Sequence, residues 1–103
     1  MSFERWGYTF EGAFSRPESL PPGQGVYVIW CEPEQGGWLV LDVGESEDAR
    51  ERVMHHERAG CWRRNCRGTI YYSATYTPGF TEEQRRAIEQ RIRNLKNPPC
   101  GEE

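Results

Sequence analysis

Three stretches of the chain have the residue pattern of β-strands. Residues 25–31 are β-branched and aromatic and lie between glycine and proline residues, which predicts a buried strand. Turn-forming residues at 32–37 separate this run from a second one at 38–43, so the two are expected to pair as a hairpin. Residues 69–77 are again β-rich and end at a Pro-Gly pair, which predicts a third strand.

Helical spacing replaces this pattern after Gly44. Small or apolar residues recur every three or four positions from Ala49 to Gly60, behind a candidate N-cap at Ser46. The pattern predicts a helix over about residues 47–59, followed by a short helical turn around residues 61–65.

A second helix is predicted near the C-terminal end. Thr81 and Gln84 have the spacing of a capping box, and an apolar stripe formed by residues 88, 92 and 95 follows. The helix is expected to run over about 81–96 and to end before the two prolines at 98 and 99.

The order of elements is therefore strand, strand, helix, strand, helix. It predicts an α/β fold of the α+β type, with a small three-stranded, mainly antiparallel sheet flanked by helices. A chain of 103 residues is long enough for one domain, 1–103. Residues 1–23 are aromatic but interrupted by glycine and proline, and are expected to form an extended N-terminal arm packed on the domain.

The cysteines and the N-terminal sequence bear on location. No apolar run reaches about 18 residues and no signal-peptide pattern begins the chain, so a cytoplasmic protein without membrane contact is expected. The four cysteines are then expected to be reduced thiols rather than a disulfide framework. A zinc site formed by Cys61, Cys66 and His55 or His56 is a less favoured alternative, because the spacing fits no strong zinc pattern.

The net charge of −3 conceals an uneven distribution. Residues 1–49 hold two arginines against nine acidic residues (net −7), and residues 50–103 hold eleven basic against seven acidic residues (net +4). A local basic patch can bind phosphates, although a solvated helix face is the commoner role of such a run. The candidate nucleic-acid-binding residues are Arg50, Arg58, Arg63, Arg64 and Arg67.

Four further residues could form a reactive site, although on spacing alone ordinary charges on a helix surface are the commoner role of such positions. Arg52 and His56 are four positions apart, so on a continuous helix they would share one face. Arginine binds phosphate bidentately, and histidine exchanges protons near neutral pH. Tyr27 on the first strand and Glu89 on the second helix complete the set, and a carboxylate such as Glu89 can hold Mg²⁺.

The same residues resemble the pattern of the GIY-YIG nuclease superfamily. Gly25-Val26-Tyr27 is similar to the first motif and Asp42-Val43-Gly44 to the second. Arg52 then follows Gly44 by eight residues and His56 by twelve, and Glu89 stands at the family's metal-binding glutamate. The likeness covers about residues 25–89. The segments 76–79, 88–91 and 98–101 are similar to a small single-domain bacterial branch.

The resemblance implies a DNA endonuclease dependent on Mg²⁺ or Mn²⁺, acting in repair or restriction. Glu89 would hold the metal, Tyr27 would act as general base, Arg52 would neutralise the phosphoryl charge, and His56 would orient or accept the proton. Asp42 departs from the pattern because the family has a second tyrosine there. Asp42 would either add a metal ligand, or leave the fold as a catalytically impaired nucleic-acid-binding or interaction module. A partner protein could supply DNA specificity, and the sequence does not define an oligomeric state.

Overall fold

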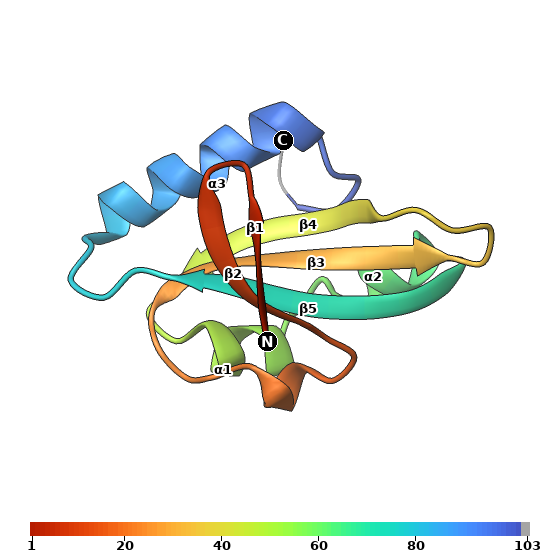
Figure 1. Cartoon of the computed structure of the whole chain (residues 1–103), viewed down its shortest axis with the longest axis horizontal. Coiled ribbons are helices and arrows are strands. Elements are labelled where there is room, and N and C mark those ends of the chain that lie inside the picture. The colour runs from red at the N-terminus through yellow and green to blue at the C-terminus, as the bar shows by residue number, and fades with distance from the viewer. Residues whose placement is uncertain (102–103) are drawn as a thin grey trace.

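The computed structural model of the chain describes residues 1–101, which form one antiparallel sheet of five strands with three α-helices (Figure 1). The order of the strands across the sheet is β1-β2-β5-β3-β4. Their bounds are Ser2–Arg5 for β1, Tyr8–Phe14 for β2, Gly25–Pro33 for β3, Leu39–Ser46 for β4 and Gly68–Tyr76 for β5. The prediction of a three-stranded sheet was therefore wrong, whereas the α+β class holds.

The two additional strands come from the segment that was expected to be an arm. β1 and β2 form a hairpin in which Arg5 pairs with Tyr8, so only Trp6 and Gly7 make the turn. Both turn residues have positive φ, 54° and 88°, as in the type I′ turns that suit the twist of a hairpin. Asn-Gly is the usual sequence of such a turn. Because Trp6 stands in place of the asparagine, the sequence did not indicate a turn here. The glycine that suggested an irregular arm is a turn residue.

The three expected strands are present, with bounds that differ by a few residues at most. β3 is buried along nearly its whole length because β4 and β5 pair with its two edges and other elements cover both faces. Its continuous apolar run reflects this position. β4 extends to Ser46, beyond the expected end at residue 43, so Gly44 and Glu45 belong to the sheet.

The expected helix over 47–59 is shorter, α1 (Ala49–Met54), and the helical turn expected around 61–65 is a second short helix, α2 (Ala59–Arg64). Asp48, rather than Ser46, is the N-cap of α1, and its side chain accepts a hydrogen bond from the backbone of Glu51. α1 ends at His55, so His56 lies in the connection between the helices. The break has a tertiary cause, because residues 56–62 make side-chain contacts with β3 and β4 that a continuous helix would not direct there.

The C-terminal helix agrees closely with its prediction. α3 (Glu82–Lys96) begins with a capping box between Thr81 and Gln84 and ends at Asn97, which has a left-handed backbone. Ile92 is fully buried, but Leu95 is 55% exposed and does not continue the apolar stripe. Among the helices of residues 1–101, none combines the length and the apolar character needed to cross a bilayer.

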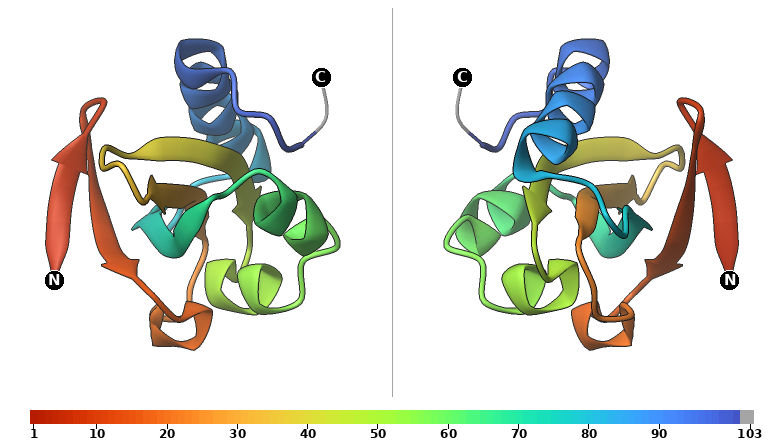
Figure 2. Two further views of the ribbon diagram at one scale, coloured as in Figure 1. Left: turned by 90° about the vertical axis from the view of Figure 1, so that its right-hand side faces the viewer. Right: turned by 90° about the vertical axis from the view of Figure 1, so that its left-hand side faces the viewer.

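The helices cover opposite faces of the sheet (Figure 2). On one face, α1 and α2 enclose a core that includes Tyr27, Ile29 and Trp62. On the other face, α3 and the N-terminal hairpin enclose a second core that includes Phe10, Trp30 and Ile92. β4 is an edge strand, so residues from both layers can meet around its free edge.

All four cysteines are paired, contrary to the prediction of reduced thiols. Cys31 is bonded to Cys66 and Cys61 to Cys100, with Cα separations of 5.5 and 6.0 Å that lie within the normal disulfide range. The pairing also removes the zinc alternative, because neither Cys61 nor Cys66 has a free thiolate. Disulfides persist mainly in oxidising compartments, so the cysteines no longer support a cytoplasmic location.

Candidate functional site

A polar cavity of about 430 Å³ opens where β3 and β4 meet α1, the connection between α1 and α2, and α3. Three of the predicted catalytic residues, Tyr27, Arg52 and Glu89, line it. His56 and Asp42 lie behind the lining, with 7% and 0% of their surface exposed. The complete lining is Tyr27, Gly44, Glu45, Arg52, Arg58, Arg86, Glu89, Gln90 and Arg93.

Tyr27 reaches the cavity because the residue opposite it on β4 has no side chain. Tyr27 pairs with Gly44, and the phenol ring lies directly across this glycine. A Cβ atom added at residue 44 would lie 2.1 Å from Tyr27 Oη and 2.2 Å from Cζ. A glycine at the second motif therefore fixes where the tyrosine of the first motif can lie.

The hydrogen bonds of His56 fix its tautomer. The backbone N–H of Arg58 donates to His56 Nδ1 at 3.1 Å, so in the neutral ring the proton is on Nε2. Nε2 lies 2.7 Å from Tyr27 Oη and donates to it. The phenol proton of Tyr27 is then directed away from His56, which makes Tyr27 a hydrogen-bond donor toward the cavity. His56 in this arrangement orients Tyr27 and does not accept its proton.

Burial opposes the charged form of both residues. It raises the pKa of Tyr27 above its ordinary value of 10, although the guanidinium of Arg52 acts in the opposite direction. Burial, together with the positive charges of Arg52 and Arg58, lowers the pKa of His56 to about 4. Near neutral pH both groups are therefore uncharged, and Tyr27 does not act as a base with the cavity in this state.

The lowered pKa of His56 predicts a stability change with pH. In the unfolded chain His56 takes up a proton near pH 6.5, whereas in the folded protein it does so only near pH 4. The unfolded state thus binds more protons within this window, and we expect the free energy of unfolding to fall by about 2 kcal/mol from pH 7 to about pH 5. Denaturant titrations of the parent and of His56→Gln measure this slope.

The matched control for this prediction is His55→Gln. His55 is exposed and contacts Glu51 on the surface, so its removal should leave the slope unchanged. A parent protein that is equally stable at both pH values, or a His56→Gln variant that retains the full slope, would contradict the prediction.

Asp42 is the most heavily hydrogen-bonded side chain of the site. Its Oδ1 accepts from the backbone N–H of Val43 at 2.8 Å, from Arg58 Nη2 at 3.2 Å and from Arg93 Nη2 at 2.6 Å. Its Oδ2 accepts from Arg58 Nε and from Trp62 Nε1, both at 2.8 Å. These five contacts fill the roughly four lone-pair sites of a carboxylate. Arg93 Nη2 also donates to the backbone oxygen of Val43.

These contacts argue against one of the two roles considered for Asp42, that of an added metal ligand. A carboxylate with every lone pair used by a donor has none left for a metal ion, so the geometry favours a structural role. The expected repulsion between Asp42 and a phosphate is also reduced, because Arg58 and Arg93 neutralise the charge of Asp42. Asp42 holds two arginines at the cavity wall.

The remaining charged groups of the cavity are arranged in pairs. Arg52 binds Glu57 through Nη1 and Nη2 at 2.7 and 3.0 Å, and this contact lowers the pKa of Glu57 to about 2. Glu89 Oε2 lies 3.3 Å from Arg93 Nε. Glu45 contacts Arg85 at 2.9 Å and Arg86 at 3.5 Å. Four arginines line the cavity and each is paired with a carboxylate, so an anion would bind through the guanidinium N–H groups that these pairs leave over and not through a net positive charge.

A divalent metal ion would be held in this cavity by few protein ligands. Within residues 1–101, no group of three or more His, Cys, Asp or Glu side chains could enclose an ion. Mg²⁺ is often held by one or two carboxylates, with waters and substrate phosphates completing the shell. Glu89, which is 23% exposed at the cavity, matches that requirement.

Comparisons with known proteins do not identify the site. No family model, no curated protein and no solved structure matches this chain. The resemblance to the GIY-YIG superfamily therefore rests on the motif residues alone.

The arginine-rich segment does not act as one surface. Arg58 is turned into the cavity wall by Asp42, and Arg50 is partly buried. Arg63, Arg64 and Arg67 are exposed on α2 and the loop after it. Only these last three keep the surface position that was predicted for nucleic-acid contact.

Sequence reasoning missed several residues of the site. Arg93 and Arg86 lie on α3, four residues after and three before Glu89, so helical periodicity alone could have placed them beside it. Glu45 was missed because it was expected to lie in a loop, between a strand ending at residue 43 and a helix beginning at residue 47, whereas it belongs to β4. Trp62 reaches Asp42 only because of the break between α1 and α2, and no sequence signal indicated that break.

Proposed function

We propose that this protein is a divalent-metal-dependent DNA endonuclease that hydrolyses phosphodiester bonds. One observation carries the proposal. Tyr27, Arg52 and Glu89, which the family pattern selects from distant parts of the sequence, line the same cavity, and His56 contacts Tyr27 directly behind it. The cavity is polar and rich in arginine, which suits a phosphodiester.

Each side chain would have a distinct part in binding the phosphate. Tyr27 would donate its phenol hydrogen to an oxygen of the phosphate or to the attacking water. Within residues 1–101 Glu57 uses two of the five donors of Arg52, which leaves donors for a phosphoryl oxygen. Arg58 and Arg93, held by Asp42, would add fixed positive charge at the wall.

Glu89 is the residue that would hold Mg²⁺ or Mn²⁺. When bound, such an ion supplies Lewis-acid stabilisation of charge on the phosphate and lowers the pKa of bound water. Tyr27 then need not ionise, which is consistent with the raised pKa of its phenol. His56 would keep the Tyr27 ring in position by donating to Oη.

A second candidate function is a nucleic-acid-binding module without cleavage. The observation that favours it is Asp42, whose carboxylate occupies the place of the second tyrosine and provides no proton or free lone pair. In that case the arginine-lined cavity would bind a phosphate and release it unchanged.

The test is an assay of the purified, oxidised protein on nicked, branched, single-stranded and duplex DNA, in Mg²⁺, in Mn²⁺ and in EDTA. We expect metal-dependent cleavage of at least one of these substrates, and a loss of about 100-fold or more in Arg52→Ala. Arg16→Ala is the control, because Arg16 is exposed, pairs with Glu18 and does not line the cavity. Binding of DNA without cleavage under every condition would replace the endonuclease by the second candidate.

A further inference from the structure

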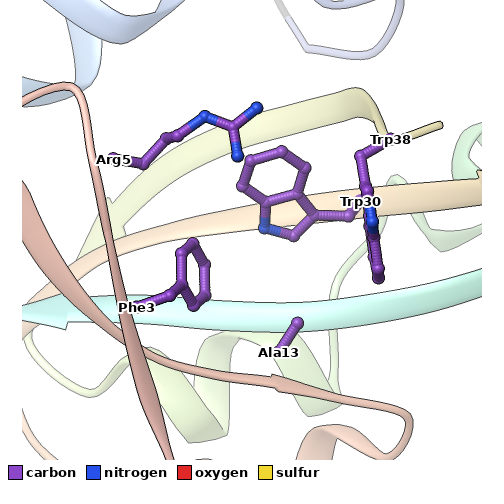
Figure 3. Close-up of a pocket in the computed structure, with 5 residues that line it drawn as sticks. All are labelled: Phe3, Arg5, Ala13, Trp30 and Trp38. Carbon is purple, nitrogen blue, oxygen red and sulfur yellow. The ribbon is translucent and has the colours of Figure 1, made fainter.

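A second hollow lies on the face of the sheet that α3 and the N-terminal hairpin cover, between this hairpin and the loop that joins β3 to β4 (Figure 3). Its volume is about 280 Å³, somewhat below the 300–1,000 Å³ that is usual for pockets enclosing a whole drug-sized ligand. Phe3, Arg5, Ala13, Trp30 and Trp38 line it, so its walls are mainly aromatic. Its size and walls suit one flat ring.

Contacts with residues of β5 hold the aromatic side chains of this hollow in place. Trp30 is buried and donates from Nε1 to Ser73 Oγ at 2.8 Å. Trp38 is 44% exposed, its ring is 6.1 Å from that of Trp30 and nearly perpendicular to it, and 5.0 Å from that of Tyr71. The buried Trp30 and the partly exposed indole of Trp38 together form a surface on which another aromatic ring can stack.

Trp38 also borders a third hollow, of about 330 Å³, toward the C-terminal segment. Lys96 lines this hollow, as Arg5 lines the first. The Arg5 guanidinium lies 5.2 Å from the ring centre of Trp30, and within residues 1–101 neither Arg5 nor Lys96 has an ion-pair partner. We call these two hollows, with Trp38 between them, the Trp38 surface.

We propose that the Trp38 surface binds single-stranded DNA, with an unpaired base stacked on Trp38 and the adjoining phosphates near Arg5 and Lys96. Aromatic stacking combined with unneutralised cations is the chemistry by which proteins bind single strands without reading their sequence. Both parts are present here, on residues that the proposed catalytic cavity does not use. The inference therefore does not depend on cleavage.

The pair of hollows favours a strand over a single nucleotide. One hollow with one cation would suit a free nucleotide, but two hollows on either side of one exposed indole suit successive nucleotides of a chain. An acidic peptide with an aromatic side chain is the competing occupant, and the test includes it.

The test measures binding of a fluorescently labelled short oligothymidylate by anisotropy, in EDTA so that no cleavage occurs. We expect Trp38→Ala to weaken binding by about 5- to 150-fold, the loss that corresponds to one stacked base. Phe80→Ala is the matched control, because Phe80 is 43% exposed and lies outside both hollows. Arg5→Gln provides a second exposed variant, expected to weaken binding and to reduce its salt dependence.

Competition then identifies the ligand. Unlabelled oligothymidylate should displace the probe, whereas thymidine 5′-monophosphate and an acidic tryptophan-containing peptide should require at least about tenfold higher concentrations. Absence of binding, or equal affinity of the parent, Trp38→Ala and Arg5→Gln, would overturn the proposal. Equal competition by the mononucleotide or by the peptide would also overturn it, in favour of a nucleotide site or a protein-docking site.

Discussion

Asp42→Asn is expected to lower the free energy of unfolding by about 3–5 kcal/mol, because it removes one partner of a buried ion-pair network. Asp42 is fully buried, and its carboxylate neutralises Arg58 and Arg93 and accepts from Trp62. An asparagine has nearly the same size, so the change creates no cavity. Its amide group, however, places donors against donors, leaves Arg58 without a counter-charge and leaves Arg93 with Glu89 alone. Urea titration of the parent and the variant measures the difference.

Asp48→Asn is the matched control for this substitution. Asp48 is the N-cap of α1, a position where asparagine and aspartate are about equally favourable, so little change in stability is expected. If Asp42→Asn unfolds within about 1 kcal/mol of the parent, the network around Asp42 contributes less than its contacts indicate. The structural role assigned to Asp42 would then be wrong.

A structural Asp42 changes how the departure from the family pattern is interpreted. The second tyrosine of the GIY-YIG pattern has no reactive counterpart in this chain. Its position is occupied by a counter-ion that directs Arg58 and Arg93 to the cavity wall. The cavity therefore has one tyrosine, Tyr27, and more fixed positive charge than the motif residues alone suggest.

Local pattern was enough to predict the elements whose signals lie close together in sequence. The capping box of α3 and the continuous apolar run of β3 are of this kind, and both elements were found. The N-terminal hairpin was missed because its turn is Trp6-Gly7, which has only half of the usual turn signal. Its pairing with β5 joins residues some 60 positions apart, which periodicity cannot show.

The sequence allowed the motif residues of the site to be predicted, but not the hydrogen bonds and ion pairs that these residues form with other side chains. The resemblance to the GIY-YIG pattern selected Tyr27, Arg52 and Glu89, which do line one cavity. The partners depend on the break between α1 and α2, which places His56 behind Tyr27 and brings Arg58 to Asp42. The disulfides were missed for a similar reason, since arguing from cellular compartment does not show which thiols the fold brings together.

Glu89→Gln is expected to slow DNA cleavage by about 100-fold or more, because an amide removes the carboxylate that would hold the metal ion. Gln has nearly the same size as Glu, so the shape of the cavity is kept. Glu83→Gln is the matched control, because Glu83 is an exposed residue on the same helix and does not line the cavity. Thermal melting of both variants separates a loss of fold from a loss of chemistry.

The most direct test of the proposed function is the single-turnover rate of DNA cleavage by the parent, Glu83→Gln and Glu89→Gln as the Mn²⁺ concentration is raised. The proposal predicts cleavage that saturates with metal in the parent and in Glu83→Gln, and almost none in a folded Glu89→Gln. Cleavage at the parental rate by Glu89→Gln, or no cleavage by a folded parent at any Mn²⁺ concentration, would contradict it.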